Sequence, residues 1–345
     1  MIDTFLVRAL SDRDMSRWDD FVLACPEATF FHRAGWKTIM EKAFKHRTHF
    51  LYAECNGRID GVLSLAEVKS RLFGHSLCSL PHCVYGGIAA TSDKARQALD
   101  HAAQELAKKL NVDHLEYRGF TETHPDWAHK DLYATFRKEL FADHEKNMLA
   151  IPRKQRAMVR KGIKAELRSE LDNNIDRFFA LFADNVHRHG TPALSKRYFE
   201  LLMEVFGRDC EVLTVVSSDN KPLSSVLAFY FRDEVLPYYA GDDFSARDFA
   251  ANDFKYWDLM RRAVERGSRL FDYGRSKIGT GPYHFKKNWG FEPTPLRYEY
   301  QLHRATHVPD QNPMNPKYRL FIKAWKAMPL ALANRIGPHI VKYLG

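Results

Sequence analysis

The sequence predicts an α/β (α+β) protein that contains two similar domains. With 345 residues, the chain is too long for one ordinary core, because most domains hold roughly 100–200 residues. Hydrophobic residues make up 45% of the chain and charged residues 28%, a composition that excludes a disordered or fibrous protein. The predicted helices and strands also occur in the same order in both halves, which indicates an internal repeat.

The elements of the first half are predicted from residue patterns. Runs of β-branched and aromatic residues between turn residues indicate strands, whereas apolar residues spaced three and four apart indicate helices. In chain order, these patterns predict helices over 14–24 and 34–45, strands over 49–54, 59–69 and 76–88, a helix over 93–110 and a strand over 112–120.

The second half repeats this order of elements. It is predicted to contain helices over 174–188 and 195–206, strands over 211–218, 222–231 and 234–241, a helix over 250–266 and a strand over 269–276. The offset between the halves is about 156–162 residues, counted from Tyr117 to Tyr273 and from Leu51 to Leu213. We therefore predict one domain over residues 1–148 and a second of the same architecture over residues 171–305. A chance similarity between two α+β patterns is the alternative.

A basic segment over residues 149–170 connects the two predicted domains. Its sequence IPRKQRAMVRKGIKAELR holds seven cationic residues and one acid, and the spacing after Pro152 is helical. Five cations fall largely on one face of that helix: Arg153, Arg156, Arg160, Lys161 and Lys164. Such a face suits a phosphate or a polyanion, with Arg156 and Arg160 as the expected contacts, whereas a solvated linker helix is the alternative.

Residues 306–345 form a basic tail with no acid after Asp310. The apolar residues of this tail, which include Phe321 and Trp325, are spaced to form one face of a helical segment. A basic amphipathic segment of this kind is suited to the surface of an anionic membrane. The alternative is that the tail packs against the second domain.

The charge balance and the cysteine count bear on partners and on location. Lys and Arg number 52 against 43 Asp and Glu, which gives a formal net charge of +9 and favours anionic partners. The five cysteines are thinly spread and form no disulfide framework, and we find neither a signal peptide nor a transmembrane run. We therefore predict a cytoplasmic protein whose tail makes peripheral contact with the inner membrane.

The densest group of functional side chains lies in LFDYGRSKIGTGPYHFKKNWGF, over residues 270–291. A predicted strand carries Asp272 and Arg275 into a loop whose glycines let the backbone turn and approach a ligand closely. One carboxylate, several cations, hydroxyls and aromatic rings converge within this segment, which suits a phosphorylated or sugar-containing ligand. A glycine-rich hairpin anchored by Trp289 is the alternative.

Three motifs carry a resemblance to a known family. FDYGRSKIGTGPYHFKKNWG, the basic IPRKQRAMVRK stretch and the Gly190-Thr191-Pro192 turn resemble the FemAB-type branch of the GNAT acyltransferase superfamily. The likeness covers about residues 5–303 and is greatest for the subgroup associated with PEP-CTERM/exosortase loci. It implies two tandem GNAT-like domains, each a twisted mixed β-sheet flanked by helices. It also implies acyl or aminoacyl transfer to an amine or hydroxyl of a cell-envelope precursor, of peptidoglycan or exopolysaccharide type.

The resemblance, taken with the chemistry of acyl transfer, assigns roles to residues of this chain. Asp272 is expected to orient or deprotonate the attacking amine, while Lys286 or Lys277 polarises the donor carbonyl or a phosphate. No Ser-His-Asp order or activated cysteine is evident, so we expect direct transfer without a covalent enzyme intermediate. The expected substrate contacts are Arg275, Ser276, Tyr239, Tyr283, Trp289, Thr191, Arg156 and Arg160, and the expected donor contacts are Arg247, Asn252 and Lys255.

The sequence leaves the acyl donor open between acyl-CoA and aminoacyl-tRNA. GNAT enzymes that use acyl-CoA hold its pyrophosphate with a glycine-rich loop at a helix N-terminus, but residues 247–252 lack glycine and contain Asp248. The corresponding first-domain loop over 86–92 has glycines but no basic residue ahead of them. We expect no tightly bound cofactor, and no metal, because the His and Cys residues of HSLCSLPHC do not form two separated ligand pairs.

Two other classes of function stay open. A nucleic-acid-binding module would use the basic helix and the positive charge, and its affinity for generic duplexes or RNA would fall steeply with salt. A non-catalytic scaffold of an exopolysaccharide assembly complex would tolerate substitutions throughout residues 272–289. For the transferase, the expected partners are an anionic, phosphorylated or lipid-linked saccharide or peptide substrate and, with an aminoacyl donor, tRNA.

Overall fold

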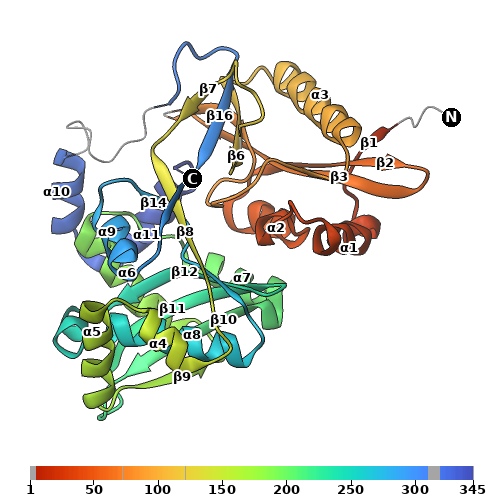
Figure 1. Ribbon diagram of the computed structural model, residues 1–345. Coiled ribbons are helices and arrows are strands. Elements are labelled where there is room, and N and C mark those ends of the chain that lie inside the picture. The colour runs from red at the N-terminus through yellow and green to blue at the C-terminus, as the bar shows by residue number, and fades with distance from the viewer. Residues whose placement is uncertain (1–4, 72, 121, 310–318, 345) are drawn as a thin grey trace. The chain divides into compact units, whose positions relative to one another are not determined.

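The computed structural model describes residues 5–71, 73–120, 122–309 and 319–344. The chain forms two compact units, each built around one eight-stranded sheet (Figure 1). The first unit runs to Leu132 and is completed by two later segments, which begin at Pro295 and at Lys342. The second unit runs from Tyr133 to Thr294 and includes the C-terminal helices as far as Val341.

The first unit contains a mixed sheet with the strand order β1-β2-β3-β4-β6-β16-β7, and β5 pairs with β3 beside β4. The strands are β1 (Leu6–Ala9), β2 (Arg47–Cys55), β3 (Arg58–Ser70), β4 (Gly74–Cys78), β5 (Ile88–Ala90), β6 (His114–Gly119), β7 (Ala128–Lys130) and β16 (Arg297–Leu302). The helices are η1 (Asp12–Asp14), α1 (Met15–Ala24), η2 (Phe30–His32), α2 (Gly35–Ile39), η3 (Met40–Phe44) and α3 (Asp93–Leu110).

Helices cover both faces of this first sheet, because its strands alternate apolar residues toward each side. Figure 1 shows α3 on one side of the sheet and α1 and α2 on the other. On the α3 side, Leu99 packs against Leu63 and Leu65 in one buried cluster. On the α1 side, the Trp18 ring lies 5.6 Å from the Phe50 ring.

The second unit contains a sheet with the strand order β14-β8-β13-β12-β11-β10-β9, and β15 pairs with β8. The strands are β8 (Tyr133–Glu139), β9 (Arg168–Asp172), β10 (Cys210–Val216), β11 (Pro222–Phe231), β12 (Glu234–Asp242), β13 (Leu270–Asp272), β14 (Ser276–Lys277) and β15 (Pro293–Pro295). The helices are α4 (His144–Ala150), α5 (Arg153–Lys164), α6 (Asp176–His189), α7 (Lys196–Phe206), η4 (Gly207–Asp209), η5 (Phe244–Phe249), α8 (Ala251–Glu265), α9 (Gly281–Asn288), α10 (Arg319–Ala327) and α11 (Leu330–Val341).

Helices also cover both faces of the second sheet. Val226 and Ala228 of β11 share a buried cluster with Trp257 of α8. Phe229, the residue after Ala228, points to the opposite face, where its ring meets Phe206 of α7.

Both units use the same arrangement of strands, which confirms the predicted α/β fold with two tandem domains. In each unit, antiparallel strands are followed by a helix and then by a strand that runs parallel to one of them. In the first unit β6 runs parallel to β4, with Ser76 opposite His114. In the second unit β13 runs parallel to β12, with Glu234 opposite Leu270.

The boundaries of the units differ from the predicted domains at 1–148 and 171–305, because one strand of each sheet comes from the other half of the sequence. Strand β8 lies before residue 148, yet it pairs with β13 in the second sheet. Strand β16 lies before residue 305, yet it pairs between β6 and β7 in the first sheet. The observed division therefore falls between Leu132 and Tyr133.

The basic connecting segment and the tail helices α10 and α11 pack within the second unit. Helix α5 lies against α8, and a Cβ atom at Gly162 would come within 2.8 Å of the Phe254 side chain. Helices α10 and α11 contact α6, as the alternative for the tail anticipated. Residues 310–318 of the predicted tail, Lys317 among them, lie outside the described residues. No helix in the described part of the chain is both long and apolar enough to cross a bilayer.

Candidate active site

The candidate active site lies where the parallel strands β12 and β13 of the second unit separate. The two strands pair only at Glu234 with Leu270 and at Val235 with Phe271. Strand β12 then continues to Asp242 with a bulge, since Leu227 pairs with Tyr239 and the next residue of β11 pairs with Pro237. Along one edge of β12, the backbone N–H and C=O groups beyond Val235 are therefore not paired with β13. Such groups can form hydrogen bonds with another segment or with a ligand. We call this place the strand divergence.

The corresponding place in the first unit is filled by the chain itself. Strands β4 and β6 pair as far as Cys78 and Glu116, after which residues 79–87 turn aside, so the predicted strand over 76–88 is interrupted. Arg118, which is only 2% exposed, donates hydrogen bonds from Nη1 to the carbonyl oxygens of Leu80 at 3.1 Å and Cys83 at 2.9 Å. The buried guanidinium therefore holds this segment in place, and the second unit is the better candidate for ligand binding.

Asp272 fixes the turn that follows β13. This carboxylate is fully buried, and its Oδ1 accepts a hydrogen bond of 2.7 Å from the backbone N–H of Gly274. Its Oδ2 lies 3.3 Å from Nε of Arg137 on β8. Gly274 adopts a φ of 62°, in the left-handed region that favours glycine. The first residue of the predicted site, Asp272, therefore uses its carboxylate to hold the turn at Gly274 in place.

Lys286 holds the same turn from α9. Its buried Nζ donates to the carbonyl oxygens of Tyr273, Gly274 and Arg275, at 2.7, 2.9 and 3.1 Å. Burial lowers the pKa of Lys286 to about 7, whereas the three carbonyl acceptors favour the ammonium form, whose three N–H groups match them in number. Lys286 thus uses its donors within the chain and fixes three consecutive peptide groups.

Trp289, which we expected to contact substrate, is a core residue. Its side chain is fully buried, and its Nε1 donates a 3.0 Å hydrogen bond to Oδ1 of Asp253 on α8. Gln155 of α5 donates to the same oxygen at 3.3 Å. Burial raises the pKa of Asp253. A fully buried indole touches no ligand, so Trp289 instead joins α9 to α8 and α5.

Other predicted residues stay accessible around the turn. Arg275, Lys277 and Tyr283 are partly exposed, and the Arg275 guanidinium lies 4.7 Å from the centre of the Tyr133 ring. The buried hydroxyl of Ser276 has no hydrogen-bond partner in the described part of the chain. The same holds for the hydroxyl of Tyr273. Because a buried polar group without a partner is costly, both hydroxyls are suited to meet a ligand or water.

The three residues predicted to contact the donor lie in different surroundings. Lys255 is fully buried, and its Nζ pairs with Asp242 at 2.9 Å, so it is already neutralised within the chain. Arg247 is exposed, with its guanidinium 3.9 Å from the centre of the Phe244 ring. Asn252 lies in the first turn of α8, whose N–H groups lack acceptors within the helix and favour an anion. Arg247 and this helix end therefore fit the phosphates of a donor, while Lys255 does not.

The remaining predicted contacts are spread over other elements. The Tyr239 hydroxyl on β12 hydrogen-bonds the Tyr198 hydroxyl at 2.9 Å. Thr191 is exposed at the end of α6, and Arg160 is exposed on α5. Arg156 is partly exposed, and its buried Nε has no partner among the described residues. In the described part of the chain, neither Thr191 nor Arg160 shares a hydrogen bond or ion pair with the turn at Asp272.

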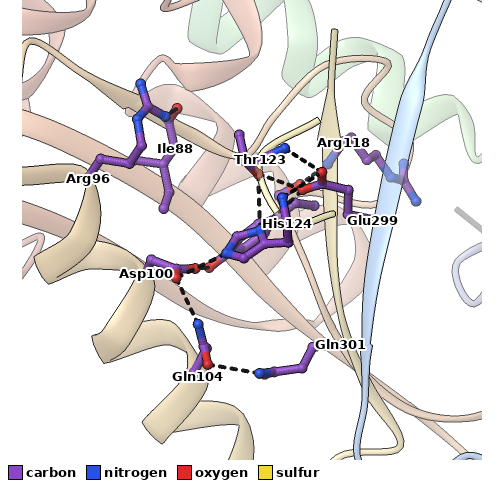
Figure 2. Close-up of polar contacts among 11 residues, drawn as sticks. Ile88, Arg96, Asp100, Gln104, Arg118, Thr123, His124, Glu299 and Gln301 are labelled. Atoms are coloured by element: carbon purple, nitrogen blue, oxygen red, sulfur yellow. Dashed lines mark hydrogen bonds and ion pairs between the residues drawn. The ribbon is translucent and has the colours of Figure 1, made fainter. Parts of the chain in front are cut away.

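A polar network in the first unit was not predicted from the sequence. Figure 2 shows His124 between Asp100 of α3 and Glu299 of β16, with distances of 3.1 Å from Nε2 and 3.2 Å from Nδ1. Hydrogen bonds that the ring donates to both carboxylates raise the pKa of His124 to about 9, against the effect of burial. The ring stacks on Trp127 at 3.8 Å. Both ring nitrogens are engaged, so this histidine fixes the loop around residue 124.

The first unit also carries a surface pocket of about 750 Å³, lined by α1, the β2–β3 turn and the start of α3. None of the predicted site residues lines it. Two of its cations are paired, Arg58 with Asp60 and Arg17 with Glu54, both at 2.8 Å. All five cysteines are buried and form no disulfide bond with one another, and no group of His, Cys, Asp and Glu side chains among the described residues is suited to a metal ion.

Comparison with known proteins identifies the type of fold. Residues 146–287 match the model of the acetyltransferase (GNAT) domain family. No curated protein sequence shows significant similarity to the chain.

Several solved structures have a similar fold. FemX superimposes with a TM-score of 0.67 at 15% identity, over 92% of this chain and 100% of that one. The C-terminal domain of a putative lysylphosphatidylglycerol synthetase from Agrobacterium fabrum gives 0.57 at 14% identity, over 84% and 92% of the two chains. A tandem GNAT protein from the clavulanic acid biosynthesis pathway gives 0.53 at 13% identity, over 86% and 98%. Residues 146–287 therefore match a GNAT domain, and the chain as a whole has the fold of tandem GNAT proteins.

Proposed function

We propose that the protein is an acyl- or aminoacyl-transferase whose reaction takes place at the strand divergence. The observation that carries this proposal is the position of the GNAT domain match. Residues 146–287 include both diverging strands and the turn that Asp272 and Lys286 hold. In an acyltransferase, an open strand edge can bind the amide groups of an extended donor through backbone hydrogen bonds.

The proposed reaction is a direct transfer between donor and acceptor. An acceptor amine or hydroxyl attacks the donor carbonyl, so that a C–N or C–O bond forms. The C–S bond of an acyl-CoA, or the ester C–O bond of an aminoacyl-tRNA, breaks. The proton lost by the attacking group ends on the leaving thiolate or alkoxide, so the balance requires no further reactant. The protein contributes by holding both molecules in reach and by stabilising negative charge on the carbonyl oxygen.

Within this proposal, Asp272 and Lys286 act by positioning the turn. Asp272 is fully buried and Lys286 is 8% exposed, and both are hydrogen-bonded to the backbone of residues 273–275. The turn then presents Arg275, Ser276 and Lys277, with Arg275 suited to an anionic group of the acceptor. Direct roles for Asp272 as base and Lys286 as electrophile remain the competing hypothesis.

The class of acceptor is proposed from the fold relatives and the motifs. The name of the Agrobacterium fabrum relative describes a putative synthetase of lysylphosphatidylglycerol, an aminoacylated membrane lipid, and FemX gives the highest TM-score of the three structures compared. We therefore propose an amine or hydroxyl on a cell-envelope precursor, of peptidoglycan, exopolysaccharide or lipid-linked type. The narrower link to PEP-CTERM/exosortase loci stays a prediction from the motifs.

A donor screen on the full chain tests this proposal. Native mass spectrometry of the purified protein would detect bound small molecules, and radiolabelled acyl-CoAs and aminoacyl-tRNAs would then be offered with amine and hydroxyl acceptors. We expect one donor class to support transfer. Lys286→Met should abolish that transfer, while Lys287→Met on the exposed neighbouring residue should retain it. Equal activity in these two variants would contradict the assignment of the site.

A further inference from the structure

Each of the two C-terminal helices of the second unit carries exposed apolar and cationic side chains. In α10, Leu320, Lys323, Ala324 and Ala327 are all exposed and recur at the spacing that places residues on one side of a helix. Leu320 is 77% exposed. In α11, Leu332 and Arg335 are exposed as well. Phe321 and Lys326 are exposed on the flanks of α10, and the stem of Lys326 also passes Gly190, with its Cε 3.1 Å from where a Cβ atom would lie. We call the exposed residues Leu320, Phe321, Lys323, Lys326, Leu332 and Arg335 the tail face.

These helices are seated firmly on the second unit, so the tail face has a fixed direction. A Cβ atom at Gly190 would lie 2.5 Å from Cγ2 of Ile322, and one at Gly337 would lie 3.1 Å from the carbonyl oxygen of Ala193. The distance at Gly190, together with its φ of 80°, favours glycine at that position, and the contact at Gly337 is tight. Trp325 is buried on the inner side of α10. The Gly190-Thr191-Pro192 turn thus serves as the seat of the tail, and Figure 1 shows α10 in dark blue at the left edge of the second unit.

The charge of the tail face is entirely positive. Residues 319–344 contain no Asp or Glu, and Lys323, Lys326 and Arg335 make no ion pair with any described residue. Elsewhere in the chain, cations are commonly paired, as Arg197 is with Glu204. An acid-free face of this kind is complementary to an anionic partner.

The apolar residues of the tail face narrow the choice of partner. Phe321 is 40% exposed and Leu332 is 45% exposed. The tail face therefore combines cations with apolar side chains whose burial away from water would be favourable. A second copy of the same face would bring like charges together, which opposes self-association. A mixture of exposed aliphatic and aromatic side chains with Lys and Arg is typical of helices that lie in the headgroup region of a bilayer.

We propose that the tail face docks the protein on an anionic lipid membrane. Leu320, Phe321 and Leu332 enter the headgroup region, while Lys323, Lys326 and Arg335 contact lipid phosphates. Because α10 and α11 are fixed to the second unit, docking places the GNAT domain at the membrane surface. This role is independent of whether the domain transfers acyl groups, since lipid binding involves no transfer step.

Vesicle co-sedimentation of the full chain tests this proposal. The probes are vesicles of phosphatidylcholine alone and of phosphatidylcholine mixed with phosphatidylglycerol. The protein should bind the mixed vesicles and not the neutral ones, and salt should weaken the binding. Each basic residue near an anionic surface contributes roughly fivefold in partitioning, so the triple variant K323Q/K326Q/R335Q should bind on the order of a hundredfold more weakly.

Two further variants separate lipid docking from general charge effects. L320S should weaken binding by about fivefold or more, because it removes apolar surface from the contact. K42Q/K94Q/K109Q removes three exposed lysines of the first unit and should bind as the unmodified protein does. Circular dichroism should show that all variants are folded. The proposal is overturned if the protein ignores anionic vesicles, binds neutral ones equally, or keeps its affinity in both tail-face variants.

Discussion

The His124 network makes a quantitative prediction about pH and stability. The pKa of His124 is raised from 6.5 to about 9 in the folded protein, so the charged imidazole stabilises the fold. This contribution is fully present below pH 6.5 and is lost as the pH rises through 9. Since one pKa unit corresponds to about 1.4 kcal/mol, the loss amounts to roughly 3 kcal/mol.

The pKa of Glu299 determines the low pH at which the pair with His124 stops stabilising the fold. Hydrogen bonds from His124 and Thr123 lower the pKa of Glu299 to about 2, although burial opposes this. Its stabilising effect is therefore present above pH 4.5 and is lost as the pH falls through 2. The contact between His124 and Glu299 contributes to both pKa shifts, so the two stabilising free energies cannot be added together. The network should stabilise the first unit most between about pH 4.5 and 6.5.

Urea unfolding followed by circular dichroism, combined with NMR of labelled histidine, checks this prediction. Between pH 6 and pH 9.5, the unmodified protein should lose roughly 3 kcal/mol more than His124→Gln, which lacks the titrating charge. His101→Gln, at an exposed position of α3, should behave as the unmodified protein. The reasoning is refuted if the His124 imidazole titrates at or below 6.5, or if both variants share one pH dependence.

Three further predictions concern the second unit. Trp289→Phe should lower the free energy of unfolding in urea by about 2–4 kcal/mol, because it opens a cavity and removes a hydrogen bond to Asp253; a change below about 1 kcal/mol would contradict the core role. Gly190→Val should speed hydrogen exchange in α10, whereas Gly207→Val, also at positive φ but with open space around it, should not; equal effects would contradict the proposed seat. Asp272→Asn should lower kcat/KM about tenfold with an unchanged pH profile, and loss of one limb of that profile would favour the role as base.

The repeated order of helices and strands was predictable because each element is indicated by the residue pattern of its own segment. Alternating apolar residues and turn pairs identify strands such as β10 and β11 without knowledge of their neighbours. The strand with which a given strand pairs cannot be predicted from such a local pattern. Strand β8 has the same kind of pattern whether it joins the first sheet or the second, and its pairing with β13 depends on contacts such as Arg137 with Asp272. Sequence periodicity carries no information on such distant pairing, so the domain boundary was misplaced.

The site was predictable as a group of residues, but the burial of its members was not. Asp272 and Lys286 do meet at one turn, as the density of functional residues suggested. Lys255 was expected to contact the donor, yet Asp242 neutralises it inside the protein. His124 was missed because its partners come from α3 and β16, which are far apart in the chain. Whether a charged residue is available to a ligand can therefore be judged only when its contacts in the folded protein are known.

Hydrogen exchange measured by mass spectrometry tests most directly whether the donor binds at the strand divergence. The full chain would be compared with and without the acyl-CoA or aminoacyl-tRNA selected by the donor screen. We predict slower exchange in residues 236–242 of β12 and 273–277 of the turn, with no change in residues 57–60 and 91–94 beside the first-unit pocket. Protection confined to that pocket, with residues 236–242 and 273–277 unaffected, would contradict the proposed active site.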